Sequence, residues 1–148
     1  MISIHEVTDR NPALLARLVE VWASSVLATH DFLAQSDFTV LKREMPSYLT
    51  AVPVLLTAEE NGSPVAFMGL AGAECAMLFV AAESRGRGIG RALLEEAVRH
   101  RNVTRVTVNE QNTQAVGFYE HMGFHVTERS PLDAQGRPYP ILTMRLSG

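Results

Sequence analysis

The chain has 148 residues, of which 47% are hydrophobic and 20% charged, and its formal net charge is −3. This length predicts one domain, residues 1–148, that can bury enough surface to fold without a disulfide or a structural metal. The acidic balance argues against nucleic-acid binding, for which a basic excess is typical, and the single cysteine, Cys75, excludes an internal disulfide and favours a reducing, cytoplasmic compartment.

The first half of the chain is expected to form a strand, two helices and three more strands. Residues 2–8 alternate apolar and polar side chains, as a half-buried strand does. Residues 11–30 carry a helical apolar repeat, with Asn11 suited to cap the helix and Pro12 to its first turn. Residues 36–50 predict a second, weaker helix. Three apolar segments are then expected to be strands: residues 52–58, 64–72 and 74–82.

The apolar run over residues 65–82 is nearly long enough to cross a bilayer. Gly69, Gly72 and Glu74 interrupt it, and a charge in mid-membrane is costly. Two buried strands joined by a tight turn explain the run better. The first ten residues also lack the basic-then-apolar order of a signal peptide. We therefore expect neither a membrane partner nor a secretion signal.

The second half of the chain alternates helices with strands. Ile89, Leu93 and Ala97 fall on one line of a helix. The later elements are a strand, a short helix and two closing strands: residues 105–110, 112–123, 124–130 and 139–147. The complete order is β-α-α-β-β-β-α-β-α-β-β. Because hairpins dominate it, we expect an α+β fold with a mostly antiparallel sheet covered by helices.

A glycine-rich turn precedes the helix that begins near Ile89. The sequence "ESRGRGIGRALLEE" places Gly86, Gly88 and Gly90 at alternate positions, with arginines between them. Glycines let the backbone approach a ligand closely, and a helix N-terminus offers free N–H groups to an anion. The turn therefore predicts a phosphate site. Its ligand is a dinucleotide, a nucleoside triphosphate or the pyrophosphate of coenzyme A.

Two of these ligands fit the turn poorly. A P-loop needs Gly-Lys followed by Ser or Thr, but here Gly90 precedes Arg91 and Ala92. A dinucleotide fingerprint needs a small residue where Arg91 stands. Glu110 does lie about twenty residues further on, where a ribose-binding acid is expected. The dinucleotide interpretation therefore stays open as the weaker alternative.

Two motifs resemble those of the GNAT family of N-acetyltransferases. Arg85-x-x-Gly88-x-Gly90 at the start of a helix is similar to the family's acyl-CoA-binding motif. Downstream, "NEQNTQAVGFYEHMGF" is similar to its N-x-x-A-x-x-x-Y-x-x-x-G-F segment. The element order resembles the GNAT fold along essentially the whole chain. Within the family, "ATHDFL", "VNEQN" and "GRPYPIL" resemble a group of small bacterial members.

The resemblance implies a function as well as a GNAT acyl-CoA N-acyltransferase fold. Acetyl-CoA would be the cosubstrate, a primary amine the acceptor, and no metal would take part. Lysine side chains of proteins are the leading acceptor class, and a small amine or amino-acid derivative is the alternative. A non-catalytic acyl-CoA-binding module is a rival of another class. Homodimers are common among such relatives.

The resemblance also implies where acetyl-CoA binds. Its pantetheine arm would lie between the strands that start near Glu74 and Arg105, where its amides can bind a strand edge as a peptide does. Solvated surface positions remain the alternative for the arginines, and a plain helix N-cap for Asn112. The residues assigned to the cosubstrate are Leu78, Phe79, Val80, Arg85, Gly86, Arg87, Gly88, Ile89, Gly90, Arg91, Asn112 and Ala115.

Two catalytic residues follow from the same resemblance. Tyr119 would protonate the departing thiolate, since a phenol with a pKa near 10 can serve a thiol with a pKa near 8.5. An ordinary buried aromatic residue is the alternative. Glu74 matches the base glutamate of histone-acetylating relatives and would accept the amine proton. Alternatively, Glu74 is a turn residue that faces solvent, and a chain of water molecules acts as the base.

The acceptor is expected to meet the segment between the first two helices. His30, Asp31 and Phe32 lie there, and the family forms its acceptor pocket in this region. A helix cap and turn is the alternative interpretation of His30 and Asp31. The remaining histidines show no ligand spacing, and we predict no metal site.

Overall fold

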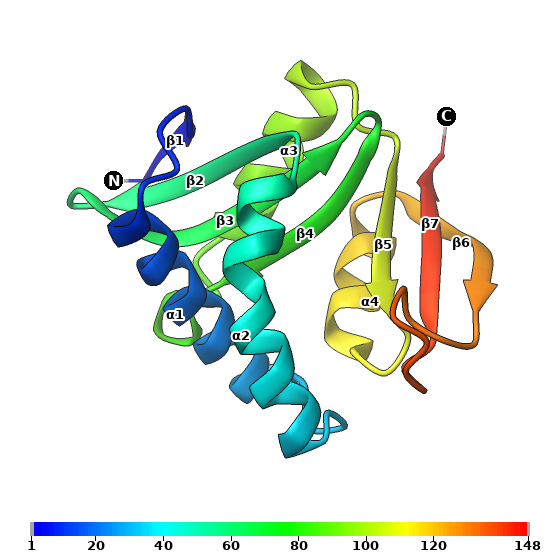
Figure 1. The fold of residues 1–148 in the computed structure, drawn as a ribbon. Coiled ribbons are helices and arrows are strands. Elements are labelled where there is room, and N and C mark those ends of the chain that lie inside the picture. The colour runs from blue at the N-terminus through cyan, green and yellow to red at the C-terminus, as the bar shows by residue number, and fades with distance from the viewer. Residues whose placement is uncertain (1, 148) are drawn as a thin grey trace.

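The computed structural model describes residues 2–147, and its helices and strands follow the predicted order (Figure 1). The strands are β1 (Ile2–Glu6), β2 (Val54–Glu60), β3 (Ser63–Ala71), β4 (Glu74–Val80), β5 (Arg105–Asn109), β6 (Phe124–Ser130) and β7 (Ile141–Leu146). The helices are α1 (Pro12–Thr29), α2 (Gln35–Ala51), α3 (Ile89–His100) and α4 (Thr113–His121), with a 3₁₀ turn η1 (Ala82–Ser84) before α3.

The strands form a mixed sheet in the order β1-β2-β3-β4-β5-β7-β6. All neighbours are antiparallel except β4 and β5, which run parallel. These two pair only at their first residues, Glu74 with Arg105 and Cys75 with Val106. Beyond Cys75 the two strands diverge, as the green and yellow strands of Figure 1 show. The sheet is therefore split into two parts at one end, and this split positions the candidate site.

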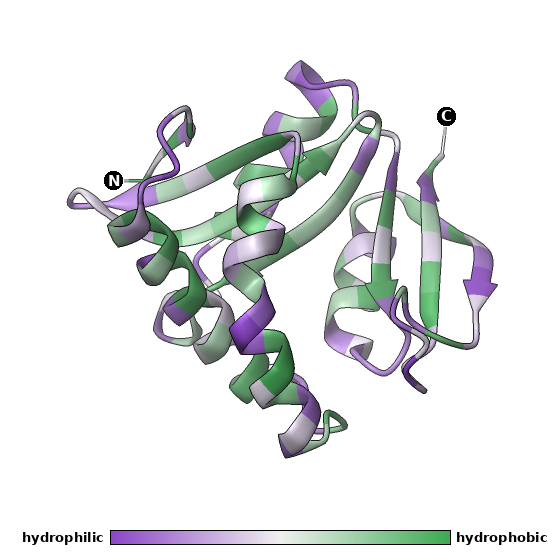
Figure 2. Ribbon diagram, in the orientation of Figure 1, coloured by the Kyte–Doolittle hydropathy of each residue, from purple (hydrophilic) through white to green (hydrophobic). Residues whose placement is uncertain are grey.

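The helices cover both faces of the sheet. Leu55 and Phe67 point to the face under α1 and α2, whereas their neighbours Leu56 and Met68 point to the face under α3 and α4. This is the two-residue alternation of a strand, and Figure 2 shows the green apolar residues on the strands beneath the helices. Fully burying one such side chain contributes about 1.5–3 kcal/mol. Both faces therefore need their helical cover.

Helix α1 begins as the sequence predicts, with the Asn11 side chain accepting a hydrogen bond from the Leu14 N–H at 2.9 Å. It is the one helix within residues 2–147 that is long and apolar enough to cross a membrane, with a mean hydropathy of 1.2. Core helices of globular proteins pass the same test. Here Leu18, Val21 and Trp22 of α1 are buried against α2 and the sheet.

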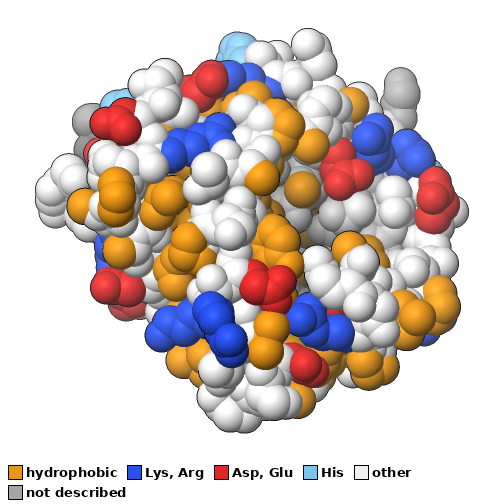
Figure 3. Space-filling model, in the orientation of Figure 1, with side chains coloured by type: hydrophobic (Ala, Val, Ile, Leu, Met, Phe, Trp, Pro, Cys, Tyr) orange, Lys and Arg blue, Asp and Glu red, His pale blue; other side chains and the backbone are white. Residues whose placement is uncertain are grey.

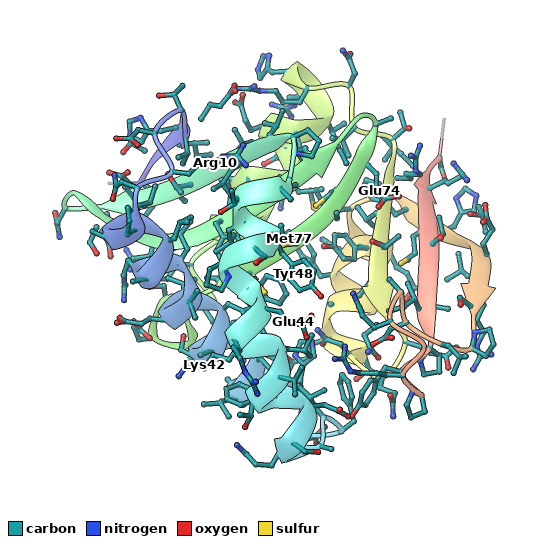
Figure 4. All side chains as sticks on the ribbon, in the orientation of Figure 1. Arg10, Lys42, Glu44, Tyr48, Glu74 and Met77 are labelled. Carbon is teal, nitrogen blue, oxygen red and sulfur yellow. The ribbon has the colours of Figure 1, made fainter. Side chains whose placement is uncertain are left out.

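The end of α2 is held by a contact that the sequence did not suggest. The Arg10 guanidinium donates hydrogen bonds to the backbone carbonyls of Leu49, Thr50 and Val52 at 2.5–3.0 Å. The last carbonyls of a helix have no hydrogen-bond donor within it. A guanidinium there donates to them and also interacts favourably with the negative end of the helix dipole. Figure 4 shows Arg10 at this end of α2. The contact ties the end of α2 to the segment between β1 and α1.

Candidate functional site

A cavity of about 540 Å³ lies where β4 and β5 diverge. Its walls come from the end of α1, the β4 edge, the glycine turn, the start of α3, the end of β5 and α4. Figure 3 shows that this face of the molecule is hollowed between the part that holds β1–β4 and the part that holds β5–β7. The lining residues are Ser25, Thr29, His30, Ala76–Val80, Ser84, Arg85, Gly86, Gly88–Arg91, Thr107–Asn109, Asn112, Gln114, Ala115, Phe118, Tyr119 and Ile141.

The glycine turn has the backbone of an anion site. Gly86 and Gly88 have φ angles of +77° and +79°, which side-chain-bearing residues adopt only with strain. Gly88 caps α3 without any side-chain hydrogen bond. The Ala92 N–H is bound to the Gly88 carbonyl at 3.0 Å, so the N–H groups before it are free of the helix. This cradle at a helix N-terminus fits a pyrophosphate.

The three arginines of the turn lie in different surroundings. Arg85 lines the cavity and donates a hydrogen bond to Gln114 of α4. Arg91 also lines the cavity, 3.6 Å from the Glu95 carboxylate. Arg87 does not line it, because its guanidinium pairs with Glu60 at the end of β2. The hydrogen bond from Arg87 lowers the pKa of Glu60. The role of Arg87 in cosubstrate binding therefore stays a prediction.

The β4 edge beside the cavity has no strand to pair with. Leu78 and Phe79 pair with β3 on one side, whereas the side toward β5 has no ladder partner after Cys75. A bulge adds Ala76 to β4, opposite the step between Gly69 and Leu70. Backbone groups along this edge are free to bind a ligand that carries amides, as a pantetheine arm does. All three predicted edge residues, Leu78, Phe79 and Val80, line the cavity.

Tyr119 reaches the same cavity from α4. It is 5% exposed, and its ring packs against Phe118 and Phe124 with ring centroids 5.3 and 6.0 Å away. Its hydroxyl makes no hydrogen bond within residues 2–147. Burial, with the neighbouring Cys75 thiol, raises the pKa of Tyr119 well above its usual value. The phenol therefore stays protonated at neutral pH and can donate a hydrogen bond to a ligand.

The start of α4 agrees with both interpretations of Asn112. Its side-chain oxygen accepts a hydrogen bond from the Ala115 N–H at 3.3 Å, so the predicted N-cap is confirmed. Asn112 and Ala115 both line the cavity. The cap uses only the amide oxygen and leaves the NH₂ group for a ligand.

Glu74 lies at the closed end of the split, where β4 and β5 still pair. Its carboxylate accepts a hydrogen bond from Arg105 Nε at 3.1 Å, and the residue is not part of the cavity lining. Figure 4 labels Glu74 beside β5, at the opposite end of β4 from the glycine turn. Its assignment as the base stays a prediction.

Only one of the three predicted acceptor residues reaches the cavity. His30 lines it, whereas Asp31 and Phe32 do not. The Phe32 ring packs between His30 and Tyr139, with centroid distances of 5.1 and 6.2 Å. Burial lowers the pKa of His30 to about 4, although the Asp31 carboxylate acts in the other direction. His30 is therefore a neutral imidazole at physiological pH.

The loop before β7, residues 131–140, is tied to α2 beside His30. Tyr139 donates a hydrogen bond to Asp37, which raises the pKa of its phenol. Arg137 lies 3.4 Å from Glu44 and 3.7 Å from Asp37. Tyr48 also donates to Glu44, at 3.0 Å, and Figure 4 shows Tyr48 and Glu44 on the side of α2 that faces β5. The loop that precedes β7 is thus tied to α2, the helix that covers the other part of the sheet.

Sequence reasoning missed several lining residues. Ser25 and Thr29 fall within the helix predicted over residues 11–30, and small polar residues on its buried side are the sequence signal of a nearby polar site. The sequence predicts Met77 only as part of the strand over residues 74–82, and does not indicate that it lines the cavity. A Cβ on Gly69 would lie 2.6 Å from Met77 Cε, so Gly69 makes room for this side chain. In the part of the chain described, no three His, Cys, Asp or Glu side chains are grouped to hold a metal ion.

Comparisons with known proteins identify the family of this fold. Residues 53–126 match the family described as "Acetyltransferase (GNAT) domain". The chain is 44% identical over 131 residues to the "Peptidyl-lysine N-acetyltransferase YjaB" of Escherichia coli strain K12, covering 88% of this chain and 89% of the relative. The solution structure of apo YjaB from Escherichia coli superposes with a TM-score of 0.88 at 41% identity, covering 100% and 99% of the two chains.

A more distant structure shows the same fold. The PaiA N-acetyltransferase of Thermoplasma acidophilum, solved in complex with coenzyme A, superposes with a TM-score of 0.73 at 22% identity. The match covers 98% of this chain and 99% of that one.

Proposed function

Because the chain belongs to the GNAT acetyltransferase family, we propose that it transfers the acetyl group of acetyl-CoA to lysine side chains of proteins. The observation that carries the proposal is the single cavity that joins the glycine turn, the free β4 edge and Tyr119. The lysine acceptor is inferred from the names of the YjaB relatives. A small amine or amino-acid derivative is the alternative acceptor.

Each wall of the cavity has a part in binding acetyl-CoA. The N–H groups from Gly86 to Arg91 receive the pyrophosphate, and Arg85 and Arg91 add positive charge. The pantetheine amides bind the unpaired edge of β4 from Ala76 to Val80. This placement directs the thioester toward the far end of the cavity.

Tyr119 is the proposed general acid. The amine nitrogen attacks the acetyl carbon, a C–N bond forms, and the C–S bond breaks with the electron pair on sulfur. A phenol that stays protonated at neutral pH can give its proton to this thiolate. The support for the role is the burial of Tyr119 in the cavity wall, with its hydroxyl free of hydrogen bonds to residues 2–147.

The cellular setting follows from the same chemistry. We place the reaction in the cytoplasm of a bacterium, because the relatives named YjaB are bacterial. The one cysteine is a free thiol, which fits a reducing compartment. Residues 1–148 act as one domain in this proposal. A homodimer is expected by analogy with relatives, and light scattering of the purified protein tests it.

The direct test is an acceptor screen with acetyl-CoA. The protein is incubated with a peptide that carries one lysine and a blocked N-terminus, with the same peptide in which arginine replaces lysine, and with small amines. We expect thiol release and a mass gain of one acetyl group only with the lysine peptide. Transfer to small amines alone would favour the alternative acceptor. Binding of acetyl-CoA without any transfer would favour a non-catalytic module.

A further inference from the structure

We propose that His30 receives the proton of the attacking amine and that Thr29 fixes the imidazole in the tautomer this step requires. The inference rests on the proposed acetyl transfer and adds the residue that handles the acceptor nitrogen. Both residues line the cavity at the end of α1. Glu74, the sequence-based candidate for this role, lies outside the lining in an ion pair with Arg105.

The hydrogen bonds of Thr29 determine the tautomer of His30. The Thr29 hydroxyl donates to the Ser25 carbonyl at 2.8 Å. The same oxygen lies 2.7 Å from His30 Nδ1. A hydroxyl has one hydrogen and a carbonyl can only accept, so Nδ1 must be the donor in the second bond. Neutral His30 therefore carries its hydrogen on Nδ1 and a lone pair on Nε2.

This lone pair is available to a ligand. Nε2 makes no hydrogen bond to any of residues 2–147. The backbone of His30 is held on both sides, because its N–H donates to the Val26 carbonyl at 2.7 Å and its carbonyl accepts from the Leu33 N–H at 3.1 Å. The Phe32 ring supports the imidazole at 5.1 Å. A rigid hydrogen-bond acceptor thus lines the reaction cavity.

The charged groups around His30 leave it neutral. Asp31 is the one whose charge acts on the imidazole, and burial outweighs it. On α2 and the loop before β7, Asp37, Arg137 and Tyr139 are engaged with one another. The nearest part of β4 contributes Met77 and Phe79, which do not ionise. An uncharged imidazole neither repels an ammonium ion nor needs to lose a proton before it accepts one. The burial that keeps His30 neutral, with a pKa of about 4, also makes Nε2 a weak base, so the transfer depends on the strongly acidic nitrogen that the attack creates.

Two side chains, His30 and Tyr119, account for all the proton transfers of the reaction. The neutral amine forms the C–N bond, and its nitrogen becomes positively charged and acidic. Nε2 takes a proton from this nitrogen, the C–S bond breaks, and Tyr119 protonates the thiolate. The imidazolium then returns its proton to the Tyr119 phenolate through solvent. Amine and thioester become amide and thiol. His30 and Tyr119 enter from α1 and α4, on opposite faces of the sheet.

The test compares His30→Ala, Thr29→Val and Thr29→Ser with a control, His100→Gln. His100 is an exposed residue at the end of α3, outside the cavity. We expect His30→Ala to lower kcat/KM for the lysine peptide by about 10²-fold, with little change in the Kd of acetyl-CoA. Added imidazole should restore part of this loss and leave the control unchanged. Thr29→Val should slow turnover about tenfold or less, whereas Thr29→Ser should keep it.

Several results would overturn the inference. They are near-native turnover of His30→Ala, a turnover loss that imidazole does not relieve, or equal turnover of the Thr29→Val and Thr29→Ser variants. If His30→Ala does not fold, His30→Gln takes its place, because glutamine can accept a hydrogen bond but not a proton. If the wild-type protein acetylates no lysine peptide, the proposed function itself is contradicted, and the role of His30 that rests on it is contradicted as well.

Discussion

The cosubstrate end of the cavity is built mainly from backbone, whereas the acceptor end is built from side chains of separate segments. At the cosubstrate end, the positive φ angles of Gly86 and Gly88 and the unpaired edge of β4 supply the binding groups. At the proposed acceptor end, His30 lines the cavity after α1, and Glu44 of α2 and Arg137 before β7 form an ion pair outside the lining. A backbone site suits one invariant ligand, and a side-chain site can be adapted to different acceptors.

The two ends also differ in their electrostatics. The glycine turn offers N–H groups and arginines to an anion. Around Arg137, the three carboxylates of Asp37, Glu44 and Asp133 outnumber one guanidinium. On the proposed function, the anionic cosubstrate meets the positive end, and a cationic lysine that approaches past this cluster meets the negative one. Variants at each end should separate these two kinds of recognition.

The largest expected effect lies where the two ends meet. Tyr119→Phe keeps the ring packing against Phe118 and Phe124 and removes only the hydroxyl. We expect kcat to fall by about 10²–10⁴-fold, with little change in acetyl-CoA affinity or melting temperature. Steady-state kinetics and thermal unfolding on one preparation check this. Near-native turnover would show that another group protonates the sulfur.

Gly90→Asp should break the cosubstrate end alone. A Cβ at Gly90 would lie 3.7 Å from Val80 and 3.9 Å from Phe118, which is ordinary contact, so a Cβ is tolerated there. The carboxylate would repel the pyrophosphate, and like charges placed together cost several kcal/mol, or about 10²-fold or more in Kd. Calorimetry with acetyl-CoA measures this, with Gly90→Ala as the matched control. Equal binding by the two variants would place the pyrophosphate elsewhere.

His30 makes the stability of the acceptor end depend on pH. Its folded pKa of about 4 lies below the unfolded value near 6.5, so the unfolded chain binds the proton more readily. Its contribution is complete above pH 6.5 and is lost as the pH falls toward 4. We expect His30→Gln to lose about 2 kcal/mol less stability than wild type between pH 7 and 4.5. Denaturant unfolding at both pH values tests this, and parallel losses would contradict it.

Arg137→Met should weaken acceptor binding and spare the cosubstrate. It removes the cation that ties the loop before β7 to Asp37 and Glu44 of α2, and the side chain is only 19% exposed. We expect the loss of this loop position to outweigh the gain in negative charge. We expect a stability loss of about 1–3 kcal/mol and a several-fold rise in KM for the peptide, with KM for acetyl-CoA unchanged. The matched control is Arg129→Met, which breaks an exposed pair with Glu110 and should cost under about 1 kcal/mol. A rise in both KM values would show that the loop serves the whole cavity.

Glu74→Gln should have the smallest effect of the series. If Glu74 only pairs with Arg105, stability falls by about 1 kcal/mol or less and the pH–rate profile keeps its shape. If Glu74 is the base predicted from the sequence, kcat/KM falls at lower pH. Rates measured between about pH 6 and 9 separate the two outcomes, and a shifted profile would favour Glu74 over His30.

The sequence predicted the parts that depend on local patterns. The element order, the Asn11 and Asn112 caps and the inward stripe of α3 follow from periodicity and capping residues, and the structure confirms them. The family resemblance and the position of the glycine turn are likewise confirmed. Each of these features can be recognised from residues that lie close together in the sequence. The assignments of individual site residues remain predictions.

What the sequence did not predict depends on contacts between distant segments. The pairing of Arg87 with Glu60 and of Glu74 with Arg105 joins residues 27 and 31 positions apart. The contact of Arg137 with Glu44 spans 93 positions. No local pattern encodes which carboxylate a given arginine meets. The tautomer of His30 was also hidden, because it depends on where the Thr29 hydroxyl points.

A structure with a bisubstrate analogue tests the account most directly. The analogue joins coenzyme A, through an acetyl bridge on sulfur, to the ε-nitrogen of a lysine peptide. We predict the pyrophosphate on the N–H groups of Gly86–Arg91, the sulfur within hydrogen-bonding reach of the Tyr119 hydroxyl, and the lysine nitrogen about 3 Å from His30 Nε2. A sulfur remote from Tyr119, or a lysine nitrogen that contacts Glu74 instead of His30, would contradict the account.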